Sequence, residues 1–259
     1  MISRNLFNLQ AMLSKAKIKL VQSLKDKKQR QIHGLFVVEG NKIIAEMLHS
    51  KIRLKTLFAT TQWIQANREL IAPDTELIEV STEELQRLAF SITPQDVLAL
   101  AFTQYPETIL PASPDQLTLA LDTIQDPGNM GTIIRLADWY GIRQIICSPG
   151  CADLYNPKVI QASMGSFLRV NVYIADLKEW LESNPDIPVY GAMMQGESIY
   201  TADLRHGILL IGNEGKGIQS ALLPLITKPV TIPRTGQAES LNAAIATAIL
   251  LDNRARQLS

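Results

Sequence analysis

The chain has 259 residues, of which 46% are hydrophobic and 19% charged, so it is long enough to bury two ordinary cores. Its longest nearly unbroken apolar stretch, residues 243–251, is much shorter than the roughly 18 to 20 residues of a membrane-spanning helix. The first residues lack the basic tip and apolar run of a secretory signal. We therefore expect a soluble, cytoplasmic protein of two domains with no membrane partner.

The cysteines and histidines argue against two kinds of site. Cys147 and Cys151 are too few for a disulfide framework, and we expect buried thiols in a reducing compartment. The three histidines, His33, His49 and His206, are scattered, with no cysteine or carboxylate cluster at ligand spacing. We therefore expect no metal.

The net charge of zero hides an uneven distribution. Residues 1–34 carry eight Lys and Arg against one acid, a net charge of +7, and the remaining residues carry −7. Clustered basic residues gain affinity for phosphates by releasing counterions, so this basic arm is a candidate for contact with a nucleic acid. A solvated helix face explains the charge equally well.

The N-terminal part of the chain has the pattern of a small α/β domain. Residues 5–34 predict one or two exposed helices, and Ser81 followed by Glu84 predicts a helix that begins with a capping box. Helical spacing is found at 40–49 and 61–70. The predicted strands are 35–39, 54–59, 76–80 and 97–102.

Three prolines without an apolar period mark residues 106–116 as a linker between a first domain, 1–105, and a second, 117–259. In the second domain, apolar strands alternate with helix-length segments, which predicts a mainly parallel sheet covered on both faces. The predicted strands are 117–124, 144–147, 170–174, 189–193, 207–212 and 229–232.

Three loops follow strands of this sheet, at the carboxyl ends where ligands collect. In the first, residues 126–135 (DPGNMGTIIR), a turn opens a helix with Asn129 near its start and Arg135 six residues later. An ordinary capping Asn and a surface Arg would explain the same pattern.

The second loop, residues 211–217 (IGNEGKG), has three glycines directly after an apolar strand. The glycine spacing matches neither the dinucleotide pattern nor the P-loop, which argues against NAD and ATP. The simpler interpretation is a glycine-rich turn that connects a strand to a helix.

The third loop, residues 232–242 (IPRTGQAESLN), precedes an alanine-rich helix. Ser240 and Asn242 are candidate caps for that helix. The alanines permit very close packing, as expected for a helix wedged against other backbone or threaded through a loop.

In this order, N-x-G-x-x-x-R, G-N-E-G-x-G and I-P-x-x-G-x-x-x-S-L-N resemble the three motifs of the SpoU (TrmH-like) family of SPOUT RNA 2′-O-ribose methyltransferases. The stretches at 153–158 (DLYNPK) and 162–165 (ASMG) are similar to the region between the family's motifs. Residues 36–41 (FVVEGN) and 93–99 (TPQDVLA) are similar to the small substrate-binding domain of many members. The resemblance thus covers almost the whole chain.

This resemblance implies a trefoil knot at the C-terminal end of the second domain, a rare exception to the rule that chains avoid threading. It also implies a homodimer with the active site near the subunit interface, and S-adenosylmethionine bound by the knotted loops. Carried onto this sequence, the cofactor-binding positions are Gly212, Ile232 and Leu241.

The positions that the resemblance makes catalytic are Asn129, Arg135, Glu214, Ser240 and Asn242. Arg135 matches the family's proposed base, but a guanidinium is normally protonated. We expect Arg135 instead to hold the target phosphate or ribose, with a phosphate oxygen or water relaying the proton. The other four would fix Arg135 and the nucleotide through hydrogen bonds.

An RNA enzyme needs phosphate contacts outside its active site. In the basic arm, the candidates are Lys25, Lys27, Lys28 and Arg30. We expect ribosomal RNA as the substrate, with transfer RNA second. A non-catalytic RNA-binding or assembly factor and a base methyltransferase of the same fold are the alternatives, and the Asn129 and Arg135 pair argues against the latter.

Overall fold

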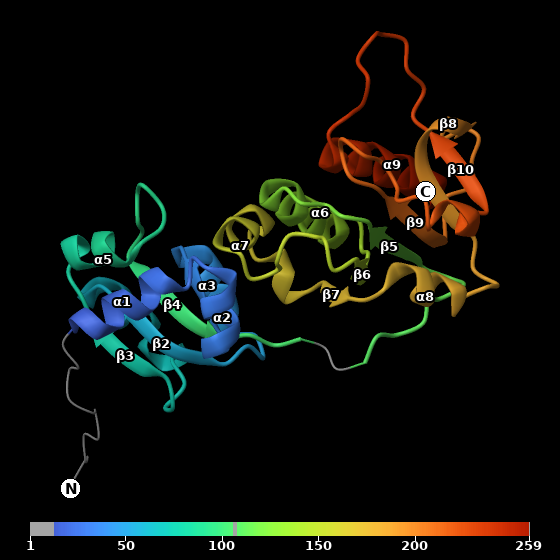
Figure 1. Cartoon of the computed structure of the whole chain (residues 1–259). Coiled ribbons are helices and arrows are strands. Elements are labelled where there is room, and N and C mark those ends of the chain that lie inside the picture. The colour runs from blue at the N-terminus through green and yellow to red at the C-terminus, as the bar shows by residue number, and fades with distance from the viewer. Residues whose placement is uncertain (1–12, 106–107, 259) are drawn as a thin grey trace, which may run out of the picture. The chain divides into compact units, whose positions relative to one another are not determined.

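The computed structural model describes residues 13–105 and 108–258. The first part of the predicted basic arm and residues 106–107 of the predicted linker lie outside these ranges. The chain separates into two compact units, Met1–Gln104 and Tyr105–Ser259 (Figure 1).

The first unit contains a four-stranded sheet in the order β1-β4-β2-β3. Strand β4 pairs antiparallel with β1 and β2, and β3 pairs parallel with β2. Its strands are β1 (Leu35–Glu39), β2 (Leu54–Ala59), β3 (Glu76–Glu79) and β4 (Val97–Phe102). Its helices are α1 (Lys15–Ser23), α2 (Lys27–His33), α3 (Asn41–Leu48), α4 (Thr61–Asn67), the 3-10 turn η1 (Arg68–Leu70) and α5 (Thr82–Leu88). The predicted α/β unit is confirmed, and so is the capping box of Ser81 and Glu84 at α5.

Some apolar residues in the described part of the basic arm belong to the core of this unit. Val21 and Leu24, from α1 and its end, are fully buried and pack in one cluster with Leu35, Phe58 and Leu98. The prediction that these helices are merely exposed is therefore wrong for α1. Its apolar residues recur at helical spacing, which buries one face and leaves the lysines outside.

The second unit contains a six-stranded sheet in the order β10-β8-β9-β5-β6-β7, in which every neighbouring pair is parallel. Its strands are β5 (Leu117–Leu121), β6 (Gln144–Cys147), β7 (Asn171–Ile174), β8 (Val189–Ser198), β9 (Gly207–Ile211) and β10 (Lys228–Thr231). Its helices are α6 (Pro127–Trp139), α7 (Pro157–Ser163), α8 (Leu177–Glu182) and α9 (Ala243–Leu258), with 3-10 turns η2 (Ser166–Leu168) and η3 (Leu223–Leu225).

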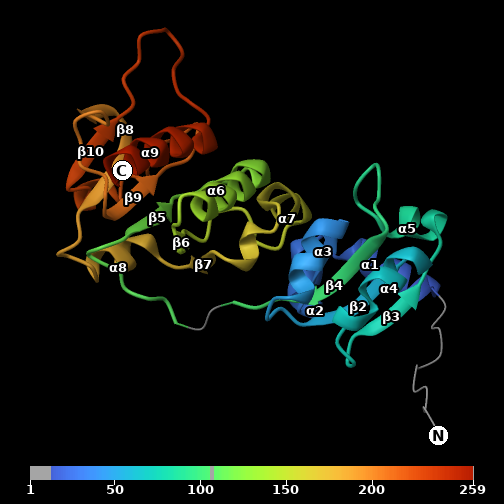
Figure 2. The same cartoon turned by 180° about the vertical axis from the view of Figure 1, so that it is seen from behind.

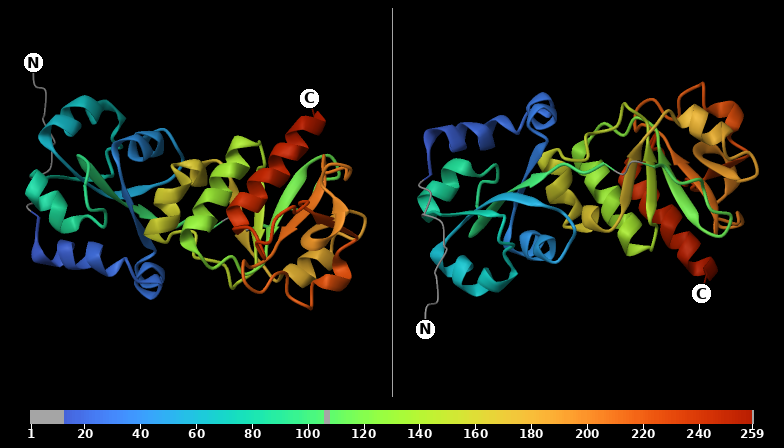
Figure 3. Two further views of the ribbon diagram at one scale, coloured as in Figure 1. Left: turned by 90° about the horizontal axis from the view of Figure 1, so that it is seen from above. Right: turned by 90° about the horizontal axis from the view of Figure 1, so that it is seen from below.

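Helices cover both faces of this sheet, as predicted. Figures 2 and 3 show α6 and α9 side by side on one face and α8 on the other. Leu177, Trp180 and Leu181 of α8 pack in one core cluster with Ala120 and Leu210 of the central strands. The trefoil knot implied by the resemblance stays a prediction.

Two strands differ in length from their prediction by more than one residue. Strand β5 ends at Leu121, three residues early, because Thr123 has a left-handed backbone (φ 54°) that no strand accommodates. Strand β8 continues to Ser198, and its pairing with β10 shifts register between Pro229 and Val230. In the described residues, no helix is both long and apolar enough to cross a bilayer.

Candidate active site

Asn129 lies in the first turn of α6, with its side chain directed at two other loops. The cap of this helix is Asp126, whose carboxylate accepts from the Asn129 backbone N–H at 2.8 Å. The interpretation of Asn129 as an ordinary cap is therefore wrong. Its Nδ2 donates to Glu214 Oε1, and its Oδ1 accepts from Asn242 Nδ2 at 2.8 Å.

Asn242 has both of the roles considered for it. Its Oδ1 accepts from the backbone N–H groups of Ala244 (2.9 Å) and Ile245 (3.2 Å), which caps α9. Its Nδ2 is thereby oriented toward Asn129. Glu214, Asn129 and Asn242 thus form a hydrogen-bonded chain that joins all three predicted loops, although they lie far apart in the sequence.

The glycine-rich loop is closed on itself. Asn213 and Gly217 exchange two backbone hydrogen bonds of 3.0 and 2.8 Å, and Gly217 has a φ of +69°. A Cβ on Gly212 would lie 2.4 Å from the Gly217 carbonyl carbon, so glycine is required there. Gly212 and Gly217 thus shape a tight turn, and Glu214 is held within it.

Arg135 does not join the chain of hydrogen bonds. It is exposed on α6, on the same face as Thr132 and Trp139, which lie three residues before it and four after it. Within the described residues it makes no hydrogen bond or ion pair. Its guanidinium is therefore free to meet a group from outside this chain.

Most of the third loop is exposed. Figure 1 shows the segment between β10 and α9 projecting from the unit. Arg234 Nη1 donates to the Ala238 carbonyl at 2.9 Å, but Ser240 is exposed and has no hydrogen bond among the described residues. Leu241 is 44% exposed, and Ile232 is half-buried next to the end of β10. Hydrogen bonds thus connect three of the five predicted catalytic residues, whereas Arg135 and Ser240 take no part in this chain of bonds.

One polar residue of this region was missed by the sequence reasoning. Asp122, directly after β5, is fully buried, and its carboxylate accepts from the Gln219 backbone N–H at 2.7 Å and from Gln219 Nε2. These bonds hold the exit of the glycine-rich loop against the end of β5. An acid that ends an apolar strand is a signal that would have singled out Asp122, whereas nothing marks Gln219.

The proposed RNA contacts separate into two kinds. Lys27 and Lys28 are exposed on α2, and exposed Lys25 has its Nζ 4.6 Å from the centre of the Phe90 ring. Arg30 is only 3% exposed, and its guanidinium donates to the carbonyls of Leu24 and Lys25, each at 2.8 Å. The expectation that Arg30 contacts RNA is therefore wrong, because its donors satisfy the end of α1.

Cys147 is the last residue of β6, and Cys151 lies in the turn that follows this strand. Cys147 is buried, and its hydrogen bond to Cys151, together with burial, raises its pKa well above the usual value. The bond from Cys147 lowers the pKa of Cys151 in spite of burial, and the Cys151 thiol donates to the Leu121 carbonyl at 3.2 Å. In residues 13–105 and 108–258, no group of three His, Cys, Asp or Glu could hold a metal ion.

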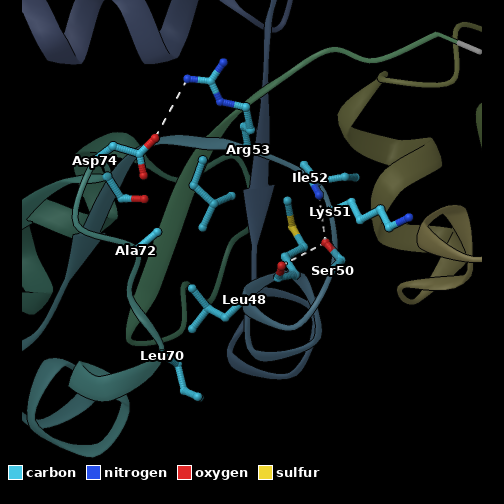
Figure 4. A pocket seen from close by; sticks show the side chains of 11 residues that line it. Leu48, Ser50, Lys51, Ile52, Arg53, Leu70, Ala72 and Asp74 are labelled. Atoms are coloured by element: carbon cyan, nitrogen blue, oxygen red, sulfur yellow. Dashed lines mark hydrogen bonds and ion pairs between the residues drawn. The ribbon is translucent and has the colours of Figure 1, made fainter.

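A separate hollow of about 210 Å³ lies in the first unit, between the end of α3 and the segment before β3. Figure 4 shows Leu48, Ile52 and Leu70 lining it, with Arg53 and Asp74 joined by an ion pair of 3.8 Å. None of the predicted site residues lines this hollow.

Comparisons with known proteins agree with this geometry. The model of the SpoU rRNA Methylase family matches residues 116–252, and that of the MRM3-like substrate binding domain matches residues 15–99. The chain is 30% identical to the 23S rRNA (guanosine(2553)-2′-O)-methyltransferase RlmP of Bacillus subtilis, over 91% of this chain and 94% of the relative.

Two solved structures have the same fold along nearly their whole length. A putative RNA methyltransferase of the TrmH family from Porphyromonas gingivalis has 38% identity and a TM-score of 0.85, covering 95% of this chain and 100% of its own. The SpoU methyltransferase AviRb from Streptomyces viridochromogenes, solved with AdoMet, has 28% identity and a TM-score of 0.84, covering 95% and 98%. The chain therefore belongs to the SpoU rRNA methylase family.

Proposed function

We propose that the protein transfers a methyl group from S-adenosylmethionine to the 2′-hydroxyl of a ribose in ribosomal RNA. The observation that carries this proposal is the chain of Glu214, Asn129 and Asn242, which joins the three motif loops at the carboxyl edge of a parallel sheet. The 23S rRNA 2′-O-methyltransferase activity for which the Bacillus subtilis relative is named and the AdoMet bound to the Streptomyces neighbour support it.

The residues present suit such a cofactor. The glycine-rich loop offers backbone groups with few side chains in the way, beginning at Gly212, and Ile232 and Leu241 offer apolar surface. When bound, S-adenosylmethionine supplies the methyl group as part of a sulfonium ion. Methyl transfer is an in-line displacement, so the ribose oxygen must be aligned and must lose its proton.

Asn129 is suited to hold the ribose. Its amide has two N–H groups and two acceptor positions, of which Glu214 and Asn242 occupy one each. One donor and one acceptor remain, held in a fixed plane, for a ribose hydroxyl. Arg135 would hold the adjoining phosphate through two parallel hydrogen bonds, and a phosphate oxygen or water would relay the proton.

We also propose a homodimer that buries the outer face of α6 and α9. Trp139 is 79% exposed and Ile245 is 53% exposed, and aromatic side chains on a surface are typical of interface cores. Arg135 shares this face, so dimerisation would place it at the subunit interface, near the active site.

RNA binding would extend to the first unit, through Lys25 in the turn before α2 and Lys27 and Lys28 on α2, in the cytoplasm where ribosomal RNA is modified. Their exposed ammonium groups are suited to phosphate contacts. We propose in the same way that Ser240 contacts the nucleotide once bound RNA covers the third loop.

The test is to incubate the protein with tritiated S-adenosylmethionine and separate pools of unmodified ribosomal and transfer RNA, followed by nucleoside analysis. We expect a labelled 2′-O-methylnucleoside in the ribosomal pool, and label in transfer RNA alone would move the substrate to that class. Cofactor binding without label in either pool would indicate an assembling ribosomal particle as substrate. Failure to bind the cofactor would favour the non-catalytic alternative.

Arg135→Ala separates catalysis from cofactor binding. We expect this variant to lose turnover while its affinity for S-adenosylmethionine stays within about threefold of the wild type. Near-normal methylation would remove Arg135 from the mechanism.

A further inference from the structure

Thr123 follows β5 with a backbone conformation that its side chain disfavours. Its φ of 54° lies in the left-handed region, which is a genuine outlier for a β-branched residue. Such conformations persist only where the surroundings determine them from several sides, and they gather at functional sites.

Three neighbours hold Thr123 in place. Its N–H donates to Ser148 Oγ at 2.9 Å, and its carbonyl accepts from Asn213 Nδ2 at 2.8 Å. On its side-chain flank lies Gly150, where a Cβ would come within 2.7 Å of Thr123 Cγ2. The carbonyl of Thr123 is therefore presented to the glycine-rich loop in one fixed direction.

Asn213 joins this fixed carbonyl to the turn that carries Glu214. Its Oδ1 accepts from the backbone N–H groups of Gly215 and Lys216, both at 3.0 Å, so the amide clasps the turn on one side and Thr123 on the other. Only a short planar amide provides one donor and one acceptor at this reach. Asp lacks the donor, and Gln is one methylene longer.

We propose that Asn213 is a positioning residue for methyl transfer: by clamping the turn to Thr123 it fixes Glu214 toward Asn129. This inference rests on the proposed function and adds to it a residue that acts through Glu214. The loop does not need Asn213 for its attachment, because Gln219 and buried Asp122 hold its exit separately. Removing the Asn213 amide should therefore loosen Glu214 while the fold remains.

The first test compares Asn213→Ala with Asp176→Ala. Asp176 likewise accepts from two backbone N–H groups, those of Lys178 and Glu179, but it caps α8, the helix that follows β7, and not the glycine-rich loop. We expect Asn213→Ala to lower kcat at least tenfold with less than a threefold change in S-adenosylmethionine affinity, and Asp176→Ala to leave both within twofold. Activity of Asn213→Ala within twofold of the wild type would overturn the proposal.

Two further variants show whether the effect passes through Glu214. Asn213→Asp keeps the two accepted bonds and loses the bond to Thr123, so it too should lower kcat; wild-type activity would contradict the clamp. The double variant with Glu214→Ala should have the same kcat as Glu214→Ala alone, within about twofold, because residues acting as a unit are not additive. A full additional tenfold loss in the double variant would contradict action through Glu214.

A measurement without turnover keeps this inference separate from the proposed function. The side-chain amide signals of Asn129 in an NMR spectrum report its hydrogen bond to Glu214. We expect Asn213→Ala to shift these signals as Glu214→Ala does, and Asp176→Ala to leave them unchanged. Unshifted signals in Asn213→Ala would refute the clamp, whereas a wild-type protein that methylates no RNA would refute only the proposed function.

Discussion

Replacing Gly131 with Ala would test how closely the helix that carries Asn129 packs against its neighbour. A Cβ on Gly131 would lie 2.6 Å from Ala162 Cβ and 2.6 Å from the Val159 carbonyl oxygen of α7. Carbon atoms pack at about 3.5 to 4.0 Å, so α6 and α7 would have to separate by about 1 Å. Neither obstacle is the flexible end of a long side chain, so the strain cannot be relieved locally.

The expected cost combines two opposing effects. Overpacking costs about 1 to 3 kcal/mol, and two contacts this short suggest the upper end, while the higher helix propensity of Ala returns about 1 kcal/mol. We expect a net loss of about 2 kcal/mol in the free energy of unfolding, or a fall of about 4 to 8 °C in Tm. A displacement of about 1 Å at Asn129 should also reduce kcat by up to about a hundredfold.

The measurement is denaturant unfolding and RNA methylation of Gly131→Ala beside Gln161→Ala, a control on the exposed face of the neighbouring helix α7. The control should change stability by less than about 0.5 kcal/mol. If Gly131→Ala were as stable as the wild type, the close contact between α6 and α7 at this residue would be contradicted.

Three further changes test separate parts of the structure. Arg30→Ala should lower the free energy of unfolding by about 2 kcal/mol, because it leaves the carbonyls of Leu24 and Lys25 without their buried donor; an unchanged denaturation midpoint would contradict this. Lys27→Glu with Lys28→Glu should weaken RNA binding and reduce the salt slope by about 1 per lost phosphate contact, with Lys178→Glu as the control; an unaltered slope would exclude α2 from the RNA interface. Partial burial raises the pKa of Asp138, but the hydrogen bonds from Arg169 and Ser166 and the charge of Arg169 together lower it by more, so the net shift of the pKa is downward. The carboxylate therefore stabilises the fold above its unfolded pKa of about 4 and loses this effect as pH falls through the folded value, so the Tm of Asp138→Asn should be below the wild type near pH 7 and converge with it in acid; a constant difference at all pH values would contradict the assignment.

The strands of both units were predictable because each is a short apolar run between turn residues. Central parallel strands such as β5 and β9 are buried on both faces, so their sequences are nearly continuous in Leu, Ile and Ala. The early end of β5 was not predictable, because the left-handed conformation of Thr123 depends on the hydrogen bond that its N–H donates to Ser148 and the one that its carbonyl accepts from Asn213. The strand propensity of the local sequence does not indicate that β5 ends at Leu121.

Charge patterning was a weaker guide than apolar patterning. Arg30 and its neighbours Lys27 and Lys28 look alike in sequence, yet Arg30 faces inward and closes the end of α1 while the lysines face solvent. The difference is set by the turn at Asp26 between the two helices, which fixes the rotation of α2. A count of basic residues contains no information about that rotation.

The candidate site depends on which strands are neighbours, and that is the part that the sequence leaves open. The loops with Asn129 and Glu214 meet because β5 and β9 pair in parallel with Leu121 opposite Ile211, so both strands end at the same level. These strands are separated in the chain by β6, β7 and β8, and many strand orders satisfy the same apolar pattern. The motifs identify the polar residues. The pairing of β5 with β9 is what brings Asn129, which follows the capping residue Asp126, within hydrogen-bond distance of Glu214. A substitution that shifts the register of this pair should therefore separate Asn129 from Glu214 without touching either side chain.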